Sequence, residues 1–298
     1  MKFKSLNFLL FSAALLMLWS CESVDQNVAE EVVVEEAADN NPDGAGASQK
    51  VEYILPSPME IASLIKKTEI SYEEGILNPT SKVEAYNDNY KKAVNLGVYG
   101  ADLGLILVFE QTQDAISYFK IVQGLTEELG IAGAFEQSIM KRVESNLGNQ
   151  DSLMVMASDA FSKADMYLKE NDRQPISTLI LAGGWIEALY ISCSFGTSTK
   201  NAEILNRIGE QKVSLTTLLS MMDRVKDEGP EYQLLGEKLQ DLGASFDKVK
   251  ITYTEVPEEP DPENMFTEVK RVSSVEITEV IFDEIASKVN ALRAELVK

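Results

Sequence analysis

The strongest constraint on the fold is a succession of long apolar segments with helical spacing, separated by short breaks. From about residue 82 onward, apolar side chains recur at every third or fourth position, and each segment is bounded by Gly, Pro, Asn or Asp. Only the stretch KVKITYTEV, residues 248–256, has a strand-like pattern. The pattern predicts helices over residues 82–109, 113–129, 133–147, 151–170, 175–195, 201–227, 231–250 and 275–297.

Two further signals precede these helices. Ser57, Pro58 and Glu60 have the spacing of a helix N-cap, a first helical residue and a capping-box partner. Asn78-Pro79 predicts a turn, after which Thr80 or Ser81 is expected to cap the next helix. We therefore expect one all-α domain over residues 51–298, built as an antiparallel multi-helix bundle or as stacked helical hairpins.

A faint similarity links the segments YGADLGLILVF and GGWIEALYISCSF, each an apolar helix led by Gly with one carboxylate near its start. The similarity is compatible with two related halves. The glycines of these two helices are Gly97, Gly100, Gly104, Gly183 and Gly184. Each helical Gly costs about 1 kcal/mol relative to Ala. Two explanations offset this cost: a close crossing of helix backbones, or a ligand pocket beside Tyr99, Trp185 and Tyr190.

The carboxylates of Asp102 and Glu187 are the candidate functional groups, because each stands among apolar neighbours in its helix. A buried carboxylate needs a partner or a proton. If the two halves face one another, the pair would lie in a central crevice as an acid–base pair or an oxygen-ligand metal site. The alternative is a structural pair, for which we expect basic or phenolic partners among Arg142, Arg173, Tyr86 and Tyr90.

Composition excludes several functional classes. The chain has no His, which removes Ser-His-Asp triads, Cys-His pairs and His-ligated zinc or haem. Its 48 acidic residues against 27 basic ones give a net charge of −21, so nucleic acid is not an expected partner. No catalytic residue, metal site or cofactor is predicted. Cys193 lies among apolar residues and is expected to be a small buried hydrophobe rather than a reactive thiol.

The N-terminus has the pattern of a lipoprotein signal peptide. Lys2 and Lys4 precede an apolar run that is shorter than the roughly 20 residues of a membrane-spanning helix. The run ends in Leu-Trp-Ser-Cys, which resembles the lipobox of bacterial lipoproteins, with Cys21 as the lipidated residue. The resemblance implies cleavage after residue 20 and attachment of acyl chains such as palmitate to Cys21. The alternative is an uncleaved membrane anchor.

Residues 21–50 are expected to form an acidic, disordered tether, because they combine low hydrophobicity with charge of one sign and contain Lys50 as their single base. The blocks LPSPMEI, KAVNLGVYGADL, LGIAGAF and AGGWIEALYI resemble uncharacterised helical lipoproteins of the Bacteroidetes type. This resemblance covers most of residues 53–195. It implies location and fold only, and no functional residue is carried over from it.

Together these patterns predict a lipid-anchored outer-membrane protein of the cell envelope, on the periplasmic face or the cell surface. Its helical domain is expected to be a non-enzymatic binding or structural module for a protein or a small ligand. The first alternative is a sensory helical bundle that binds a small molecule in a Gly-lined crevice around Asp102, Glu187, Tyr99, Trp185 and Tyr190. The second is an enzyme that works through the two carboxylates.

Overall fold

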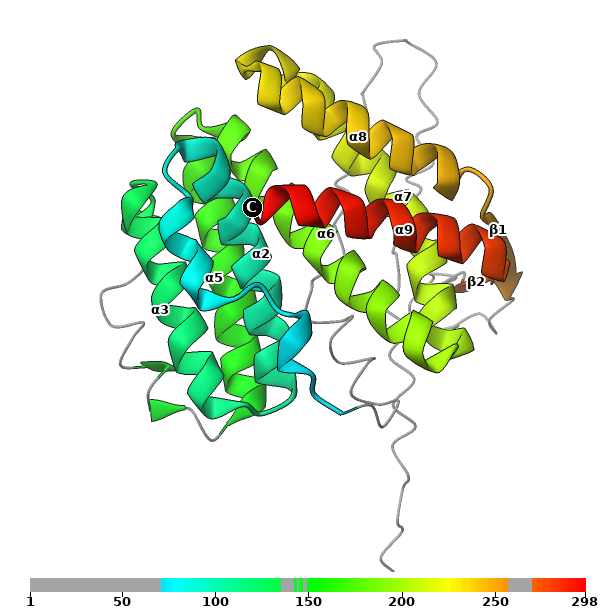
Figure 1. Cartoon of the computed structure of the whole chain (residues 1–298), viewed down its shortest axis with the longest axis horizontal. Coiled ribbons are helices and arrows are strands. Elements are labelled where there is room, and N and C mark those ends of the chain that lie inside the picture. The colour runs from blue at the N-terminus through cyan, green and yellow to red at the C-terminus, as the bar shows by residue number, and fades with distance from the viewer. Residues whose placement is uncertain (1–70, 135–141, 144, 147–148, 257–269) are drawn as a thin grey trace, which may run out of the picture. The chain divides into compact units, whose positions relative to one another are not determined.

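The computed structural model describes residues 71–134, 142, 143, 145, 146, 149–256 and 270–298. These residues form a helical bundle with one small sheet, which confirms the all-α class (Figure 1). The elements in chain order are η1 Glu74–Ile76, η2 Thr80–Ala85, α2 Asn89–Val108, α3 Thr112–Glu128, η3 Ala132–Ala134, α5 Gln150–Glu170, α6 Gln174–Thr199, α7 Ala202–Val225, η4 Lys226–Glu228, α8 Pro230–Phe246, β1 Lys250–Val256, β2 Lys270–Glu276 and α9 Glu279–Leu296.

The centre of the bundle is the pair α2 and α6, which lie against each other (Figure 1). Every residue of α2 from Ala93 to Val108 is buried, and so is most of α6. A helix that is apolar on all sides must be covered on all sides. Helices α3 and α5 cover the pair on one side, and α7 and α9 cover α6 on the other.

The glycines of α2 and α6 permit this close packing. A Cβ atom on Gly97 would lie 2.0 Å from the carbonyl oxygen of Ile180, and one on Gly183 would lie 1.9 Å from that of Val94. Backbone therefore touches backbone, and the helix-crossing explanation of these two glycines is confirmed. Gly100 has a different neighbour, because its Cβ would lie 2.2 Å from the ring of Phe161 on α5.

The central pair runs parallel, although helices that follow directly along the chain pack antiparallel. Asn95 of α2 binds Leu296 near the end of α9, and Glu187 of α6 binds Arg293 one turn earlier. Val94 of α2 lies against Gly183 of α6, and farther along both helices Asp102 lies beside Glu187. The contact positions advance along α2 and α6 together, so the two helices run in the same direction. The two similar segments noted in the sequence lie on these adjacent parallel helices. That they belong to two related halves of the domain stays a prediction.

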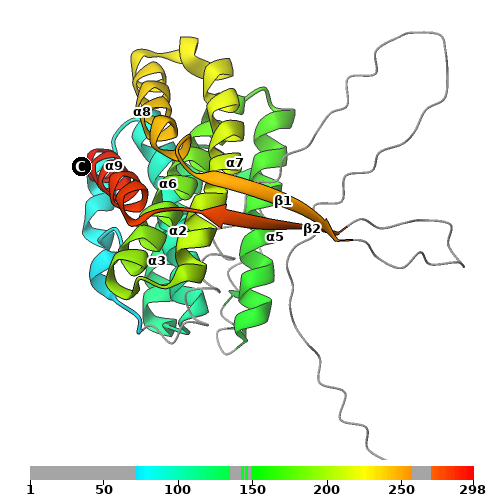
Figure 2. The ribbon, with the colours of Figure 1, turned by 90° about the vertical axis from the view of Figure 1, so that its right-hand side faces the viewer.

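The strand-like stretch at 248–256 is confirmed as β1, which pairs antiparallel with β2, Ile251 opposite Val275. The prediction of a helix starting at Val275 was wrong, because Val275 belongs to β2 and packs against Gly209 of α7. Helix α9 begins after Thr278, whose side chain accepts a hydrogen bond from the Ile281 amide. Figure 2 shows the hairpin running out beyond the helices.

The predicted start of the second helix was also wrong. Residues Thr80–Ala85 form the 3-10 helix η2, and α2 begins after Asp88. The Asp88 carboxylate accepts a 2.7 Å hydrogen bond from the Lys91 amide and so caps α2, with its negative charge at the positive end of the helix dipole. The other helix predictions from 113 onward agree with α3, α5, α6, α7 and α8 within a few residues.

Several predictions lie outside the described residues. They concern the signal peptide at 1–20, Cys21 with the tether at 21–50, the helix that starts near Ser57, and most of the helix at 133–147. In the described part of the chain, α6 alone has the length and apolar composition of a membrane span. Its apolar window is 83% buried inside the bundle, as expected for the core helix of a globular domain.

Candidate functional site

The two predicted carboxylates meet at the centre of the bundle, together with an arginine from the C-terminal helix. Glu187 accepts hydrogen bonds from Arg293, at 2.9 Å from Nε to Oε2 and 2.8 Å from Nη2 to Oε1. The Glu187 side chain is 0% exposed and that of Arg293 is 12% exposed. This two-bond arrangement is the strongest form of ion pair that an arginine makes.

Asp102 is also 0% exposed, and its carboxyl group is only partly satisfied. Oδ2 accepts a 3.0 Å hydrogen bond from the backbone amide of Asn78, whereas Oδ1 has no donor among the described residues. Two acids and one base therefore share a buried region, and a second full negative charge there would be costly.

A proton on Asp102 removes this excess charge. Burial raises the pKa of Asp102 well above its usual range, and the neighbouring Glu187 charge raises it further. Protonated Asp102 can donate a hydrogen bond to Glu187, which raises the pKa of Asp102 and lowers that of Glu187. Burial raises the pKa of Glu187 as well, although the hydrogen bonds and charge of Arg293 oppose the shift. In the cluster, protonated Asp102 therefore lies beside the Glu187 carboxylate, which in turn pairs with the Arg293 guanidinium.

The partners expected from the sequence were wrong. Glu187 pairs with Arg293, whereas Arg173 donates a 2.8 Å hydrogen bond to the carbonyl of Leu129. Arg293 carried a signal that could have identified it, since it follows Val289 by four residues on the apolar stripe of α9. A cation on an otherwise apolar helix face needs a buried anion.

The other two expected partners and Arg142 also bond or pack elsewhere. The Tyr86 hydroxyl accepts a 3.0 Å hydrogen bond from Asn78 Nδ2, and the Tyr90 ring packs edge-on against Tyr232. Arg142 is an exposed residue. Asn78 is the residue that links Asp102 to the surrounding phenols, and its fully buried position before Pro79 was predicted only as a turn.

Of the three aromatic residues predicted beside the carboxylates, two lie at the cluster. The Arg293 guanidinium stacks 4.5 Å from the ring centroid of Tyr190. Tyr99 is buried next to Asp102, where burial and nearby charge raise its pKa, and its hydroxyl donates to the Pro79 carbonyl at 3.0 Å. Trp185 points away from the cluster, because it precedes Glu187 by two residues and a helix turns by about 200° over that distance. Its indole N–H instead donates a 3.1 Å hydrogen bond to Gln211 on α7.

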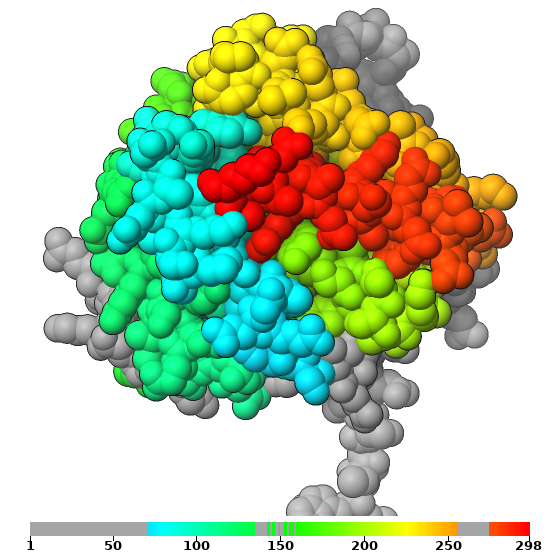
Figure 3. Space-filling view, in the orientation of Figure 1, coloured from blue at the N-terminus to red at the C-terminus, as the bar shows by residue number. Residues whose placement is uncertain are grey.

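The two carboxylates of the cluster are closed to solvent. Lys82 Nζ donates a 2.7 Å hydrogen bond to the Val297 carbonyl, and Asn95 Nδ2 donates a 3.0 Å hydrogen bond to the Leu296 carbonyl. These two bonds hold the C-terminal end of α9 against α2 and the residues before it. Figure 3 shows α9 in red meeting the cyan start of the described chain on this face. A substrate would have no route to the carboxylates without displacement of α9, so the arrangement fits a structural pair better than an acid–base pair.

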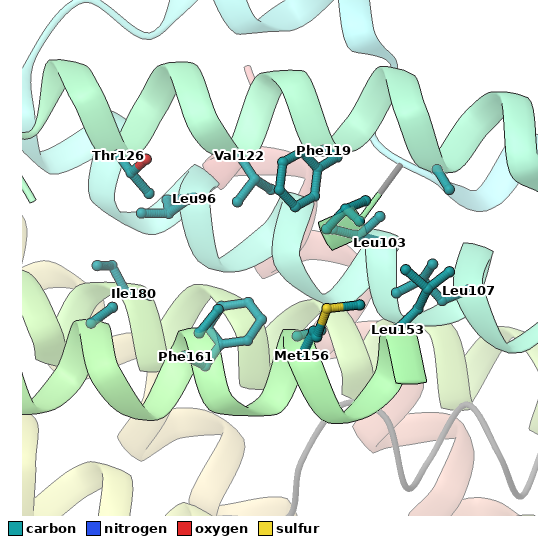
Figure 4. Close-up of a pocket in the computed structure, with 15 residues that line it drawn as sticks. Leu96, Leu103, Leu107, Phe119, Val122, Thr126, Leu153, Met156, Phe161 and Ile180 are labelled. Carbon is teal, nitrogen blue, oxygen red and sulfur yellow. The ribbon is translucent and has the colours of Figure 1, made fainter. Parts of the chain in front are cut away.

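An apolar cavity lies on the other side of α2, between α2, α3, α5 and α6 (Figure 4). Its volume is about 70 Å³. Apart from the hydroxyl of Thr126, its described lining consists of apolar side chains, with Phe119 and Val122 of α3 facing Met156 and Phe161 of α5 across the space. Gly100 belongs to this region, because its lack of a side chain makes room for the Phe161 ring.

The described residues contain no group of three or more acidic, Cys or His side chains that could hold a metal ion. Cys193 is buried, as predicted, and burial raises the pKa of its thiol, which disfavours the reactive thiolate. Comparison of the chain with protein-family models, curated proteins and solved structures gives no match. Function must therefore be argued from the site itself.

Proposed function

We propose that the chain is a lipid-anchored protein of the cell envelope whose helical domain binds a small apolar ligand without transforming it. The observation that carries this proposal is the apolar cavity between α2, α3, α5 and α6. Cavities lined by apolar side chains stay free of water and accept apolar molecules. The lipid anchor is the expected role of Cys21, which lies outside the described residues.

The size of the cavity indicates the ligand. An apolar cavity of roughly 150 Å³ accommodates benzene, so a volume of about 70 Å³ suits a narrower group such as an unbranched alkyl chain. The near absence of polar groups in the wall provides no hydrogen bond to orient a polar ligand. The binding energy would come from removal of the alkyl chain from water.

A non-enzymatic role is supported by the state of the carboxylates. Glu187 is held by Arg293, and Asp102 is enclosed with it away from solvent. An acid–base catalyst must come within hydrogen-bond distance of the substrate atom that gains or loses a proton. The alkyl site and the carboxylates lie in different parts of the bundle, so ligand binding requires no contact with them.

The test uses methyl-labelled methionine in the full chain, because Met156 lines the cavity. Titration with 1-hexanol should shift the Met156 methyl resonance in a saturable manner. Met222, which is buried in α7 outside the cavity lining, should keep its position. The variant Ala160→Leu should fill the cavity and abolish the shift.

Ser162→Leu is the matched control, because it adds the same side chain to the exposed face of α5. It should leave the Met156 shift unchanged. An unresponsive Met156 in the unaltered protein, or an equal loss in both leucine variants, would contradict the proposal.

A further inference from the structure

A second hollow lies on a different part of the molecule, between α7 and strand β1. Its volume is about 680 Å³, within the range of ligand sites. Helix α7 contributes Val213, Met221 and several hydroxyl side chains, and β1 contributes Ile251 and Tyr253. We refer to this hollow as the α7–β1 groove.

The charge of the α7–β1 groove is opposite to that of the chain. Its described lining includes Lys212 and Arg224 but no acidic side chain, although the net charge of the chain is −21. Lys212 binds the carbonyl oxygens of Asp247 and Val249, at 3.2 and 3.0 Å, and makes no ion pair with a described residue. Arg224 is exposed and makes no ion pair or hydrogen bond with any described residue. The groove is therefore a local site for anionic groups.

The wall of the groove is a strand with an open edge. In the described part of the chain, β1 pairs with β2 alone, so its second edge retains unpaired backbone groups. Tyr253 is 57% exposed and Val213 on α7 is 42% exposed, which provides apolar surface on both sides of the groove. An extended peptide can join such an edge as an added strand, with alternate side chains entering the groove.

We infer that the α7–β1 groove binds an extended acidic peptide segment of a partner protein. The peptide backbone adds to the free edge of β1, its apolar side chains contact Val213 and Tyr253, and its carboxylates lie beside Lys212 and Arg224. This site is independent of the alkyl cavity and of the lipid anchor. Because the rest of the chain repels anions, binding of an acidic peptide requires a basic site of this kind.

The test measures fluorescence anisotropy of a short fluorescein-labelled peptide of alternating Glu and Val, added to the full chain in detergent. The peptide should bind saturably, and added salt should weaken its binding. The variant Arg224→Glu should weaken binding by roughly tenfold, because it places a carboxylate beside the peptide's own carboxylates. The matched variant Lys226→Glu makes the same kind of charge change two residues away, outside the groove lining, and should leave the affinity within about twofold.

Two further peptides separate strand addition from charge attraction. A peptide of alternating Lys and Val should not bind, and an acidic peptide with N-methylated backbone amides should lose most of its affinity. The inference is overturned if the acidic peptide fails to bind, or if Arg224→Glu and Lys226→Glu weaken binding equally. Undiminished binding of the N-methylated peptide overturns the strand-addition geometry.

Discussion

Asp102 has one carboxyl oxygen bonded to the Asn78 amide and one oxygen without a described donor, in a core that holds two acids and a single base. Its protonation relieves the excess charge and supplies the missing hydrogen bond in one step. Burial raises the pKa values of the neighbouring phenols Tyr99 and Tyr118, and a negative charge on Asp102 would raise them further. The cluster therefore favours a neutral Asp102 in the folded protein.

This state has a consequence for stability as a function of pH. The folded pKa of Asp102 is raised, whereas an unfolded Asp titrates at about 3.9. The folded state consequently binds more protons than the unfolded state between these values, so stability falls as pH rises through that window. Each unit of pKa difference corresponds to about 1.4 kcal/mol of stability.

The variant Asp102→Asn should remove this dependence, because an amide has the shape of a protonated carboxyl group and donates to Glu187 without titrating. Thermal unfolding of both proteins from pH 4 to pH 9 measures the difference. The loss of stability with rising pH should be smaller in the variant, and the advantage of the variant should increase toward alkaline pH. Parallel stability curves for the two proteins would show that Asp102 is ionised in the fold.

At this scale the sequence identified the two acids but missed their base. Asp102 and Glu187 could be predicted because their helical neighbours are apolar, which is a local property. Arg293 is separated from Glu187 by 106 residues, so its role depended on how α9 packs against α6. Trp185 was wrongly grouped with Tyr190, since the choice between two faces of an entirely apolar helix depends on its neighbours.

At the scale of elements, the contact between α2 and α6 depends on glycine. The Gly97 position is in contact with both the Ile180 carbonyl and the Gly184 amide, at 2.0 and 2.5 Å from where a Cβ would lie. Backbone atoms cannot rotate away as a side chain can. A methyl group at this position must therefore separate two helices that form the centre of the core.

The variant Gly97→Ala should destabilise the protein by about 3 kcal/mol or more, because overpacking of a tight core exceeds the gain in helix propensity. Chemical denaturation measures the change. Gly124→Ala in α3 is the matched control, since no described atom beyond its adjoining residues and nearby helix backbone lies within 4 Å of its added Cβ. The control should stabilise by about 0.5–1 kcal/mol. A neutral or stabilising Gly97→Ala would contradict the close crossing.

Element boundaries were less predictable than element types. Strand β2, Lys270–Glu276, was not predicted. Seven residues are too few for their apolar spacing to distinguish a strand from a helix, and a strongly helical stretch follows directly. Its strand form depends on pairing with β1 and on contact of Val275 with Gly209. Helix α2 started later than expected, because Thr80 and Ser81 belong to the separate 3-10 helix η2 and Asp88 caps α2.

At the scale of the whole molecule, the proposed anchor depends on one residue. Replacement of Cys21 by Ala should prevent incorporation of a palmitate analogue, because acylation requires the thiol. The variant should be released from membranes or remain as the uncleaved precursor, and metabolic labelling followed by membrane fractionation distinguishes these outcomes. Cys193→Ala is the matched control and should retain the label, since Cys193 is buried in α6.

Labelling of Cys21→Ala at the level of the unaltered protein would contradict the lipoprotein prediction. In that case the alkyl cavity would still be testable, because its described lining comes from α2, α3, α5, α6 and Val143, and not from the N-terminal segment. The acidic surface adds a separate expectation, since a net charge of −21 disfavours adhesion to anionic lipid. Electrostatic adhesion to anionic lipid is therefore not expected to hold this chain at a membrane.

The sequence by itself determined the helical class, most helix positions and the pair of acids, because helical periodicity, caps and apolar neighbours are properties of adjacent residues. Tertiary structure alone decided that α2 and α6 run parallel, that Arg293 neutralises Glu187, and where the apolar cavity and the α7–β1 groove lie. These features arise from contacts between residues far apart in the chain. Such contacts follow from the packing of whole helices, which no local pattern records.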